Sequence, residues 1–165
     1  MAKQKPVKKL LLRLTLIVLL LLILCYNPVS VRLMTLGVGI YYNLDPVKFY
    51  RLVKAESSFR SFAVSEKQAI GLGQVQETTA HYVSYKHKKG LLFVPFYNLR
   101  IAALYLRYLL HRYEGNWSLA LAAYNWGETK VDKRIGNLRV LPAKDYSYLF
   151  TDIPETQTYI RRILK

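Results

Sequence analysis

The chain has 165 residues, of which 25 are Lys or Arg and 10 are Asp or Glu, so its net charge is +15. This length is enough for one domain and an appendage, and the charge favours a polyanionic partner such as nucleic acid, anionic lipid or an acidic polymer. Residues 40–165 alone carry a net charge of +9, with 19 basic against 10 acidic residues. The single cysteine, Cys25, excludes a disulfide within the chain and a cysteine-based metal site. His81, His87 and His111 are scattered without the spacing of metal ligands, so we expect no metal and no cofactor.

Residues 1–27 combine a basic start with a long apolar run. Lysines precede about 17 residues, Leu10 to Tyr26, that are apolar apart from Arg13, Thr15 and the Tyr26 hydroxyl. As a helix this run is roughly 25 Å long, slightly short of a hydrocarbon core of about 30 Å. Basic residues before the run predict that the N-terminus stays on the cytoplasmic side of the membrane and that the rest of the chain lies on the outer side. We therefore interpret residues 1–27 as a signal-anchor or transmembrane segment.

Two other interpretations of this segment stay open. The uninterrupted core from Leu16 to Cys25 also has the length of a cleaved signal peptide, although no A-x-A-like cleavage site follows it. A lipoprotein signal would need a small residue before Cys25, where Leu24 stands. All three interpretations export the body of the protein. Residues 28–43 are apolar and are expected to form a juxtamembrane connector, in part as a short amphipathic helix.

The next segment places one carboxylate on an apolar helix face. "LDPVKFYRLVKAESS" begins with Asp45 as N-cap and Pro46 at the first helical position. Glu56 then shares a face with the apolar residues three, four and seven positions before it. Desolvation on such a face raises the pKa of a carboxyl group, so Glu56 could act as a general acid near neutral pH. The alternative is an ordinary rim carboxylate paired with Arg60.

Three further helices are predicted along the rest of the chain. A stripe of apolar residues with a period of 3.6 runs through residues 98–113 and indicates a core helix. Asn116 as N-cap and Gly127 as terminator bound a second helix, which places Tyr124 near its C-terminal end. Residues 155–165 close the chain as a third helix, whereas "LLFVPFY" is interpreted as a loop or a short extended piece because it contains Pro95. We expect one mainly α domain over residues 44–165.

These segments together resemble the catalytic domain of soluble lytic transglycosylases, the SLT family, which has a lysozyme-like fold. Any single motif is weak, but several in the right order are a strong signal. They run from Asp45 to about Tyr159, most of the exported body. The matching segments are Glu56-Ser57-Ser58-Phe59, Ala63-Val64-Ser65, Gly71-Leu72-Gly73-Gln74, Asn98 with Tyr105-Leu106, Ala122-Ala123-Tyr124-Asn125-Trp126-Gly127 and Glu155-Thr156 with Tyr159.

The chain departs from the family pattern at a few positions near these motifs. Gly73 stands where the family usually has Met, and Ala102 stands where it usually has Gly. Gln76-Glu77 replaces a frequent Met-Pro, and Pro154 directly precedes Glu155. These departures concern the wall of the sugar-binding groove more than the catalytic carboxyl.

The resemblance implies a reaction and a set of roles. A lytic transglycosylase cleaves the β-1,4 bond between N-acetylmuramic acid and N-acetylglucosamine in peptidoglycan, without water, and leaves a 1,6-anhydro-muramic end. Glu56 would be the general acid and then the base, and Tyr124 would hydrogen-bond Glu56 and position it. Ser65, Gln74 and Asn125 would bind or orient the sugar, and Glu155 would line the groove. The expected location is the bacterial cell envelope, with the domain outside the cytoplasmic membrane, and the expected partners are glycan strands and the membrane.

Alternatives come from different functional classes. A goose-type-lysozyme-like muramidase of the same fold would hydrolyse the bond, and a second acid facing Glu56 across the groove would favour it. A non-catalytic scaffold would only bind peptidoglycan. Asn125 could instead be a helix C-cap and Ser65 a turn residue. Nucleic-acid binding is disfavoured by the export signal and by the absence of a DNA- or RNA-binding motif.

Overall fold

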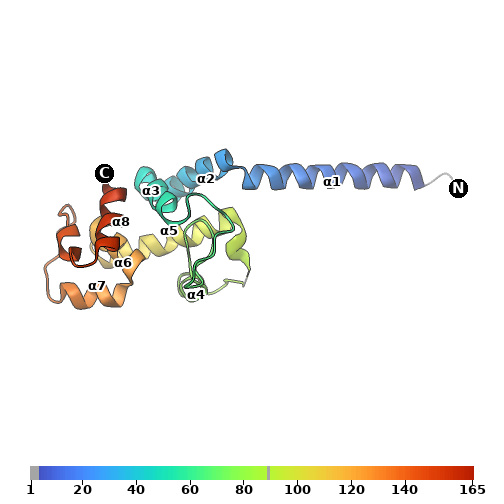
Figure 1. The fold of residues 1–165 in the computed structure, drawn as a ribbon. Helices are drawn as coiled ribbons and strands as arrows, with labels where there is room; N and C mark the ends of the chain where they lie inside the picture. Colours follow the sequence, from blue (N-terminus) through green and yellow to red (C-terminus); the bar gives the residue numbers. More distant parts are fainter. Residues whose placement is uncertain (1–3, 89) are drawn as a thin grey trace.

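A computed structural model describes residues 4–88 and 90–165 of the chain (Figure 1). The described residues form helices and loops and contain no β-strand; two isolated bridges join Val64 to Ile70 and Ile70 to Val75. The prediction of a mainly α protein is confirmed. In chain order the elements are α1 (Gln4–Tyr26), α2 (Pro28–Tyr41), α3 (Pro46–Ser57), α4 (Glu77–Val83), η1 (Leu91–Phe93), α5 (Pro95–Arg112), α6 (Trp117–Trp126), α7 (Glu128–Ile135), η2 (Ser147–Phe150) and α8 (Pro154–Leu164).

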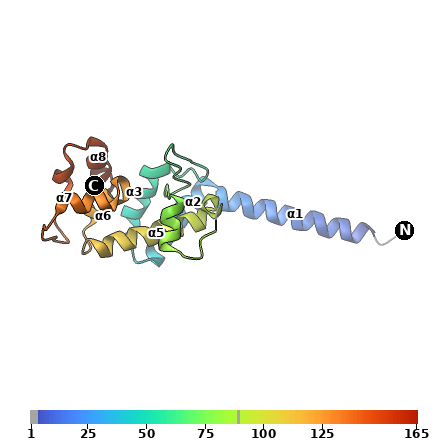
Figure 2. The same cartoon turned by 90° about the horizontal axis from the view of Figure 1, so that it is seen from below.

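Helix α1 extends away from the body as a single rod, and α7 and α8 lie at the opposite end of the molecule (Figures 1 and 2). Its residues Val7–Tyr26 contain an 18-residue window with a mean hydropathy of 2.4, and no residue of that window is buried within the protein. By length and composition, this helix could cross a membrane. An apolar rod without a protein partner needs another apolar environment, which a bilayer or a signal-peptide-binding site provides.

Helix α2 lies in the segment expected to be a juxtamembrane connector and contributes to the core. The side chain of Asn27 caps it by accepting hydrogen bonds from two backbone N–H groups of its first turn. Val31, Thr35 and Val38 are buried on one face, which packs on α3 and α5. The backbones of α2 and α3 approach closely at Gly39, where an added Cβ would lie 3.0 Å from Pro46 Cα. Residues 28–41 are thus a packed part of the body.

Helix α3 begins as its sequence predicts and ends shortly after Glu56. The Asp45 carboxylate accepts hydrogen bonds from the backbone N–H groups of Val47 and Lys48, each at 3.0 Å. Phe49, Leu52 and Val53 are completely buried. The helix stops at a left-handed turn because Ser58 has φ +53°. Glu56 therefore lies in the last turn, at the edge of the core.

Helix α5 is the central element against which α2, α4 and α6 pack. The predicted apolar stripe is confirmed, since Leu99, Ala102, Ala103, Leu106 and Leu109 are all buried. The prediction for "LLFVPFY" was wrong, because residues 91–93 form a 3-10 turn and Pro95 opens the helix itself. Proline has no N–H to lose at the first helical position and already has the φ of a helix, so it starts α5 rather than interrupting a strand.

Helices α6 and α8 complete the domain on the other side of α3. Ala120, Ala122 and Ala123 are fully buried, and these small side chains let α6 pack closely against α5, α7 and α8. Gly127 ends α6, as expected. Helix α8 confirms the predicted C-terminal helix, and the Arg51 guanidinium of α3 donates a hydrogen bond to the carbonyl oxygen of Ile163 at 3.2 Å. The packing of α3, α6 and α8 brings distant parts of the sequence around Glu56.

Candidate active site

Glu56 is a partly buried carboxylate in the last turn of α3, above the buried side chains of Leu52 and Val53. It takes no part in the ion pairs found among the described residues. The Arg60 side chain, the alternative partner, donates from Nε to the carbonyl oxygen of Ser57 at 3.0 Å. The rim-carboxylate interpretation is therefore not supported.

The surroundings of Glu56 raise its pKa from 4.5 to about 7. The largest cause is burial, which disfavours the charged form. A hydrogen bond from Tyr159 opposes this shift, and the negative charge of Glu155 adds to it. With a pKa near neutrality, Glu56 holds a proton in a large fraction of molecules and can also accept one, which suits a group that acts first as acid and then as base.

The tyrosine that contacts Glu56 comes from α8 and not from α6. The hydroxyl of Tyr159 donates a hydrogen bond to Glu56 Oε1. The predicted bond from Tyr124 was wrong, because the Tyr124 hydroxyl donates to the carbonyl oxygen of Gly73 at 2.7 Å. Burial is the main reason that the pKa of Tyr124 is raised, and the nearby charge of Glu56 adds to this shift. The sequence signal for Tyr159 was its place in the Glu-Thr…Tyr segment, but we assigned no role to Tyr159 itself from the sequence.

A cavity of about 670 Å³ opens beside Glu56. A second hollow of about 540 Å³ shares Glu56, Asn125 and Glu155 with it, so the two form one groove that passes over the carboxyl. Aromatic and basic side chains also line the first cavity, among them Tyr105, Trp126 and Lys130. All six residues predicted for the site line this cavity, namely Glu56, Ser65, Gln74, Tyr124, Asn125 and Glu155.

The polar residues of the groove are held by bonds that leave some of their atoms available. Ser65 Oγ accepts a hydrogen bond from the backbone N–H of Ala69 at 3.1 Å, so it also serves the turn. Gln74 Nε2 donates to two backbone carbonyls, the nearer at 3.0 Å. Asn125 Oδ1 accepts from the Thr156 hydroxyl at 2.8 Å, and the C-cap of α6 is Gly127 rather than Asn125. Within the described part of the chain, Gln74 Oε1 and Asn125 Nδ2 have no hydrogen-bond partner.

The floor of the groove is fixed by one buried side chain, Asn98 of α5. Its Oδ1 accepts a hydrogen bond from the backbone N–H of Gly73, and its Nδ2 donates to the carbonyl oxygens of Ile70 and Leu92, each at 2.8 Å. Asn98 is 1% exposed, so these bonds are shielded from water. Residues 70–74 are thus attached to α5, and Tyr124 bonds to the same loop at Gly73.

The two departures from the family pattern at Gly73 and Ala102 lie against each other. A Cβ added at Gly73 would lie 2.5 Å from the Cβ of Ala102 and 3.2 Å from the Tyr124 hydroxyl. A side chain at position 73 therefore needs a smaller residue at position 102. The family usually has Met and Gly at these positions, whereas this chain has Gly and Ala. The side chain that fills this part of the floor therefore comes from position 102 instead of position 73.

Two of the three histidines, which we expected to be scattered, lie together outside the groove. His81 and His87 pack edge to face with ring centroids 4.8 Å apart, and Glu77 lies beside them. His111 lies elsewhere, in the last turn of α5.

The comparison with known families rests on more than half of the chain. The sequence profile of the transglycosylase SLT domain matches residues 39–146. The chain belongs to the transglycosylase SLT family. The match confirms the predicted family.

Solved lytic transglycosylases have the same fold as this SLT protein. Lytic transglycosylase Slt of Pseudomonas aeruginosa, solved as an inactive mutant, superposes with a TM-score of 0.69 at 30% identity over 79% of this chain. The 70 kDa soluble lytic transglycosylase of Escherichia coli gives 0.65 at 24% identity over 77%. A complex of the 70 kDa soluble lytic transglycosylase with bulgecin A gives 0.67 at 23% identity over 79%. The expected lysozyme-like fold is confirmed, and this SLT protein spans 22% of each of these longer chains.

One curated relative is also similar. A putative tributyltin chloride resistance protein of Alteromonas sp. (strain M-1) is 30% identical over 102 residues. The match covers 57% of this chain and 46% of the relative, so this SLT protein spans about half of the relative's length.

The contact between positions 73 and 102 generates a stability prediction. Gly73→Met alone should lower the free energy of unfolding by about 1–3 kcal/mol, because it overpacks a closed site. Adding Ala102→Gly should recover part of that loss, giving a coupling free energy of about 1 kcal/mol between the two sites. Urea unfolding of the two single variants and the double variant in detergent measures this. Gly37→Met, at a position with open space around it, is the control; additive effects at positions 73 and 102 would contradict the argument.

The neighbours of Glu56 generate a prediction about pH. If Glu56 must be protonated for catalysis, activity falls as the pH rises through its pKa of about 7. Tyr159→Phe removes the bond that stabilises the carboxylate, so the falling limb of kcat/KM should move to higher pH. Glu155→Gln removes a negative charge, so the limb should move to lower pH. Tyr85→Phe, an exposed tyrosine, should leave the profile unchanged; shifts in the same direction for the first two variants would show that these residues do not tune Glu56 as described.

Proposed function

We propose that this protein is a peptidoglycan lytic transglycosylase in which Glu56 acts as both general acid and general base. The observation that carries the proposal is the Glu56 carboxyl group, which lines a groove, accepts a hydrogen bond from one tyrosine and has its pKa raised to about 7. Membership of the SLT family and the likeness to solved lytic transglycosylases support it. The substrate is the β-1,4 bond between N-acetylmuramic acid and N-acetylglucosamine.

In this mechanism the two oxygens of Glu56 have different tasks. Because Tyr159 donates to Oε1, the proton of the acid is available on Oε2, which has no hydrogen-bond partner among the described residues. In the first step Glu56 gives this proton to the bridging oxygen, and the bond from that oxygen to C1 of the muramic sugar breaks. In the second step the carboxylate takes the proton of the C6 hydroxyl, whose oxygen bonds to C1. The product is a 1,6-anhydro end, and Glu56 is again protonated.

The rest of the groove would bind the glycan strand. Gln74 Oε1 and Asn125 Nδ2 offer an acceptor and a donor to sugar hydroxyl and acetamido groups. Trp126 and Tyr105 provide aromatic surface for sugar rings, and Lys130 adds positive charge in the groove. Stem peptides carry carboxylates, so a body with a net charge of +9 should attract this substrate at low ionic strength. Tyr124 supports the site through its bond to Gly73.

A muramidase is the second candidate, and Glu155 is the observation that favours it. Its charge acts on Glu56, and both carboxylates line the same groove. A hydrolase with inversion or retention uses such a second carboxylate to activate water or to attack C1. Glu155 is exposed and lies in the first turn of α8. The product of the reaction distinguishes the two candidates.

The proposal predicts the product and its loss in one variant. Digestion of intact peptidoglycan with the full chain should release muropeptides with 1,6-anhydro-muramic ends, identified by mass spectrometry. Glu56→Gln keeps the shape but cannot transfer the proton, so release should fall at least about 100-fold. Glu114→Gln, an exposed acid outside the groove, is the matched control.

Three outcomes separate the candidate functions. Reducing muramic ends that vanish in Glu155→Gln would replace the transglycosylase with a muramidase. Binding of peptidoglycan without release of any product by the unmodified chain would favour a scaffold. Anhydro ends that persist in Glu56→Gln would remove Glu56 from the mechanism.

We also propose that α1 is retained as an anchor and holds the domain outside the cytoplasmic membrane of the cell envelope. Its apolar length, together with the basic residues before it, supports this orientation.

The anchor proposal predicts the location of the full-length chain. It should sediment with membranes and stay there after an alkaline wash, and the body should become sensitive to protease in spheroplasts. A variant lacking residues 1–26 should instead stay in the cytoplasm. A shorter mature chain free of membranes would mean that the segment is a cleaved signal peptide.

A further inference from the structure

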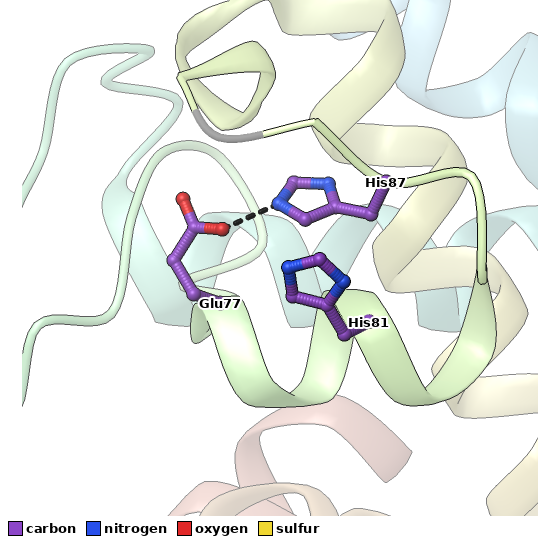
Figure 3. A group of neighbouring side chains, drawn as sticks. All are labelled: Glu77, His81 and His87. Atoms are coloured by element: carbon purple, nitrogen blue, oxygen red, sulfur yellow. Dashed lines mark hydrogen bonds and ion pairs between the residues drawn. The ribbon is translucent and has the colours of Figure 1, made fainter.

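One carboxylate and two imidazoles, those of Glu77, His81 and His87, form a cluster at helix α4 (Figure 3). Glu77 and His81 are four residues apart on α4, so their side chains project from the same face of that helix. His87 comes from the loop after α4 and points back toward them (Figure 3). One ligand atom from each of the three residues lies within 4.8 Å of the other two.

The donor set and its dimensions suit a transition metal. Two imidazole nitrogens and a carboxylate oxygen form the kind of ligand set that binds Zn²⁺, at about 2.0–2.2 Å from each atom. In a tetrahedral site, ligand atoms are therefore about 3.3 Å apart. Small side-chain rotations reach this from the present arrangement, in which His87 Nε2 and Glu77 Oε2 are 2.5 Å apart. Magnesium and calcium prefer sites made of oxygen ligands and would bind less well.

His87 is already oriented as a metal ligand would be. Its side chain is completely buried, and its Nδ1 is hydrogen-bonded to the hydroxyl of Tyr97 at 2.8 Å. This bond turns Nε2 toward Glu77 and His81. Ligating histidines commonly have such a partner on the other ring nitrogen, which fixes the ring and the tautomer. His81 is exposed, so an ion from solvent has access to the cluster.

The cluster is separate from the catalytic groove. Thr79 lines the groove, and Glu77 and His81 each lie two residues away from it on α4, on roughly the opposite side of the helix. The elements that the cluster joins are α4, the loop that carries His87 and, through Tyr97, the start of α5. An ion there would hold the groove-lining helix without touching the substrate.

We infer that Glu77, His81 and His87 bind one Zn²⁺ ion, with water as the fourth ligand, and that the ion fastens α4 to α5. The site is structural: it closes the segment of chain between the groove floor and the central helix. It does not depend on the proposed glycan chemistry, because none of its three ligands lines the groove.

The test is a titration of the full chain, purified in detergent without a polyhistidine tag and stripped of metal with a chelator. ZnCl₂ should bind with a stoichiometry of one and raise Tm by about 5 °C at saturation. Co²⁺, used as a visible probe, should give the strong absorption bands of a four-coordinate ion. Unfolding and cobalt spectra are readouts that need no enzyme activity.

Variants identify the ligands. His81→Ala is the most informative, because it leaves the bonds from His87 to Glu77 and Tyr97 in place, so the metal-free protein should keep its Tm. It should weaken zinc binding at least about 10-fold, and Glu77→Gln should do the same. His111→Ala is the matched control, since His111 is also exposed and lies outside the cluster.

Two results would overturn the inference. One is the absence of zinc binding by the unmodified chain up to about 100 µM, well above the Kd of a structural site. The other is binding that His81→Ala leaves unchanged, or that His111→Ala weakens equally. Either result would leave His87 as a buried histidine that only joins Glu77 to Tyr97 by hydrogen bonds.

Discussion

The site depends on the partial removal of one carboxyl group from water. Glu56 lies at the end of α3, where the buried face of that helix meets the groove, and burial is the main reason that its pKa rises to about 7. Burial alone would leave the carboxyl protonated and poorly oriented. The Tyr159 bond limits the rise and fixes one oxygen. Because Tyr159 belongs to α8, the acid is complete only when the last helix of the chain has packed on α3 and α6.

Because Glu56 depends on the packing of α8, small residues far from Glu56 affect the site. The buried alanines of α6 let α5, α7 and α8 pack closely around that helix, and α8 carries the tyrosine. On the other side, Asn98 holds the loop that bears Gly73, and Tyr124 bonds to the same residue. The shift of side-chain volume from position 73 to position 102 therefore occurs in a part of the protein that is held by these hydrogen bonds. It changes the shape of the floor while the position of Glu56 is kept by a different set of contacts.

The sequence predicted helices and faces well, and hydrogen bonds between helices poorly. Caps such as Asp45 and the apolar stripe of α5 are local features, so they could be recognised without knowledge of the packing. The choice between Tyr124 and Tyr159 as the partner of Glu56 could not, since periodicity does not say how α6 and α8 are rotated against α3. Helices α4 and α7 were not predicted because they are short and polar. His87 joins Glu77 and His81 through a loop whose path depends on α5, so spacing alone made these residues seem unrelated.

The junction between α1 and the body constrains how the groove could be presented to the cell wall. Tyr26, the last residue of α1, stacks on Phe62 with ring centroids 5.0 Å apart, and its hydroxyl donates a hydrogen bond to the carbonyl oxygen of Phe93. Only Asn27 separates α1 from α2, and α2 is packed into the core. A chain fastened in this way has no long linker on which to swing. With α1 in a bilayer, as proposed, the loop around Phe62 would lie at the lipid surface. The enzyme would then reach only glycan strands close to the membrane, unless the substrate itself moves toward it.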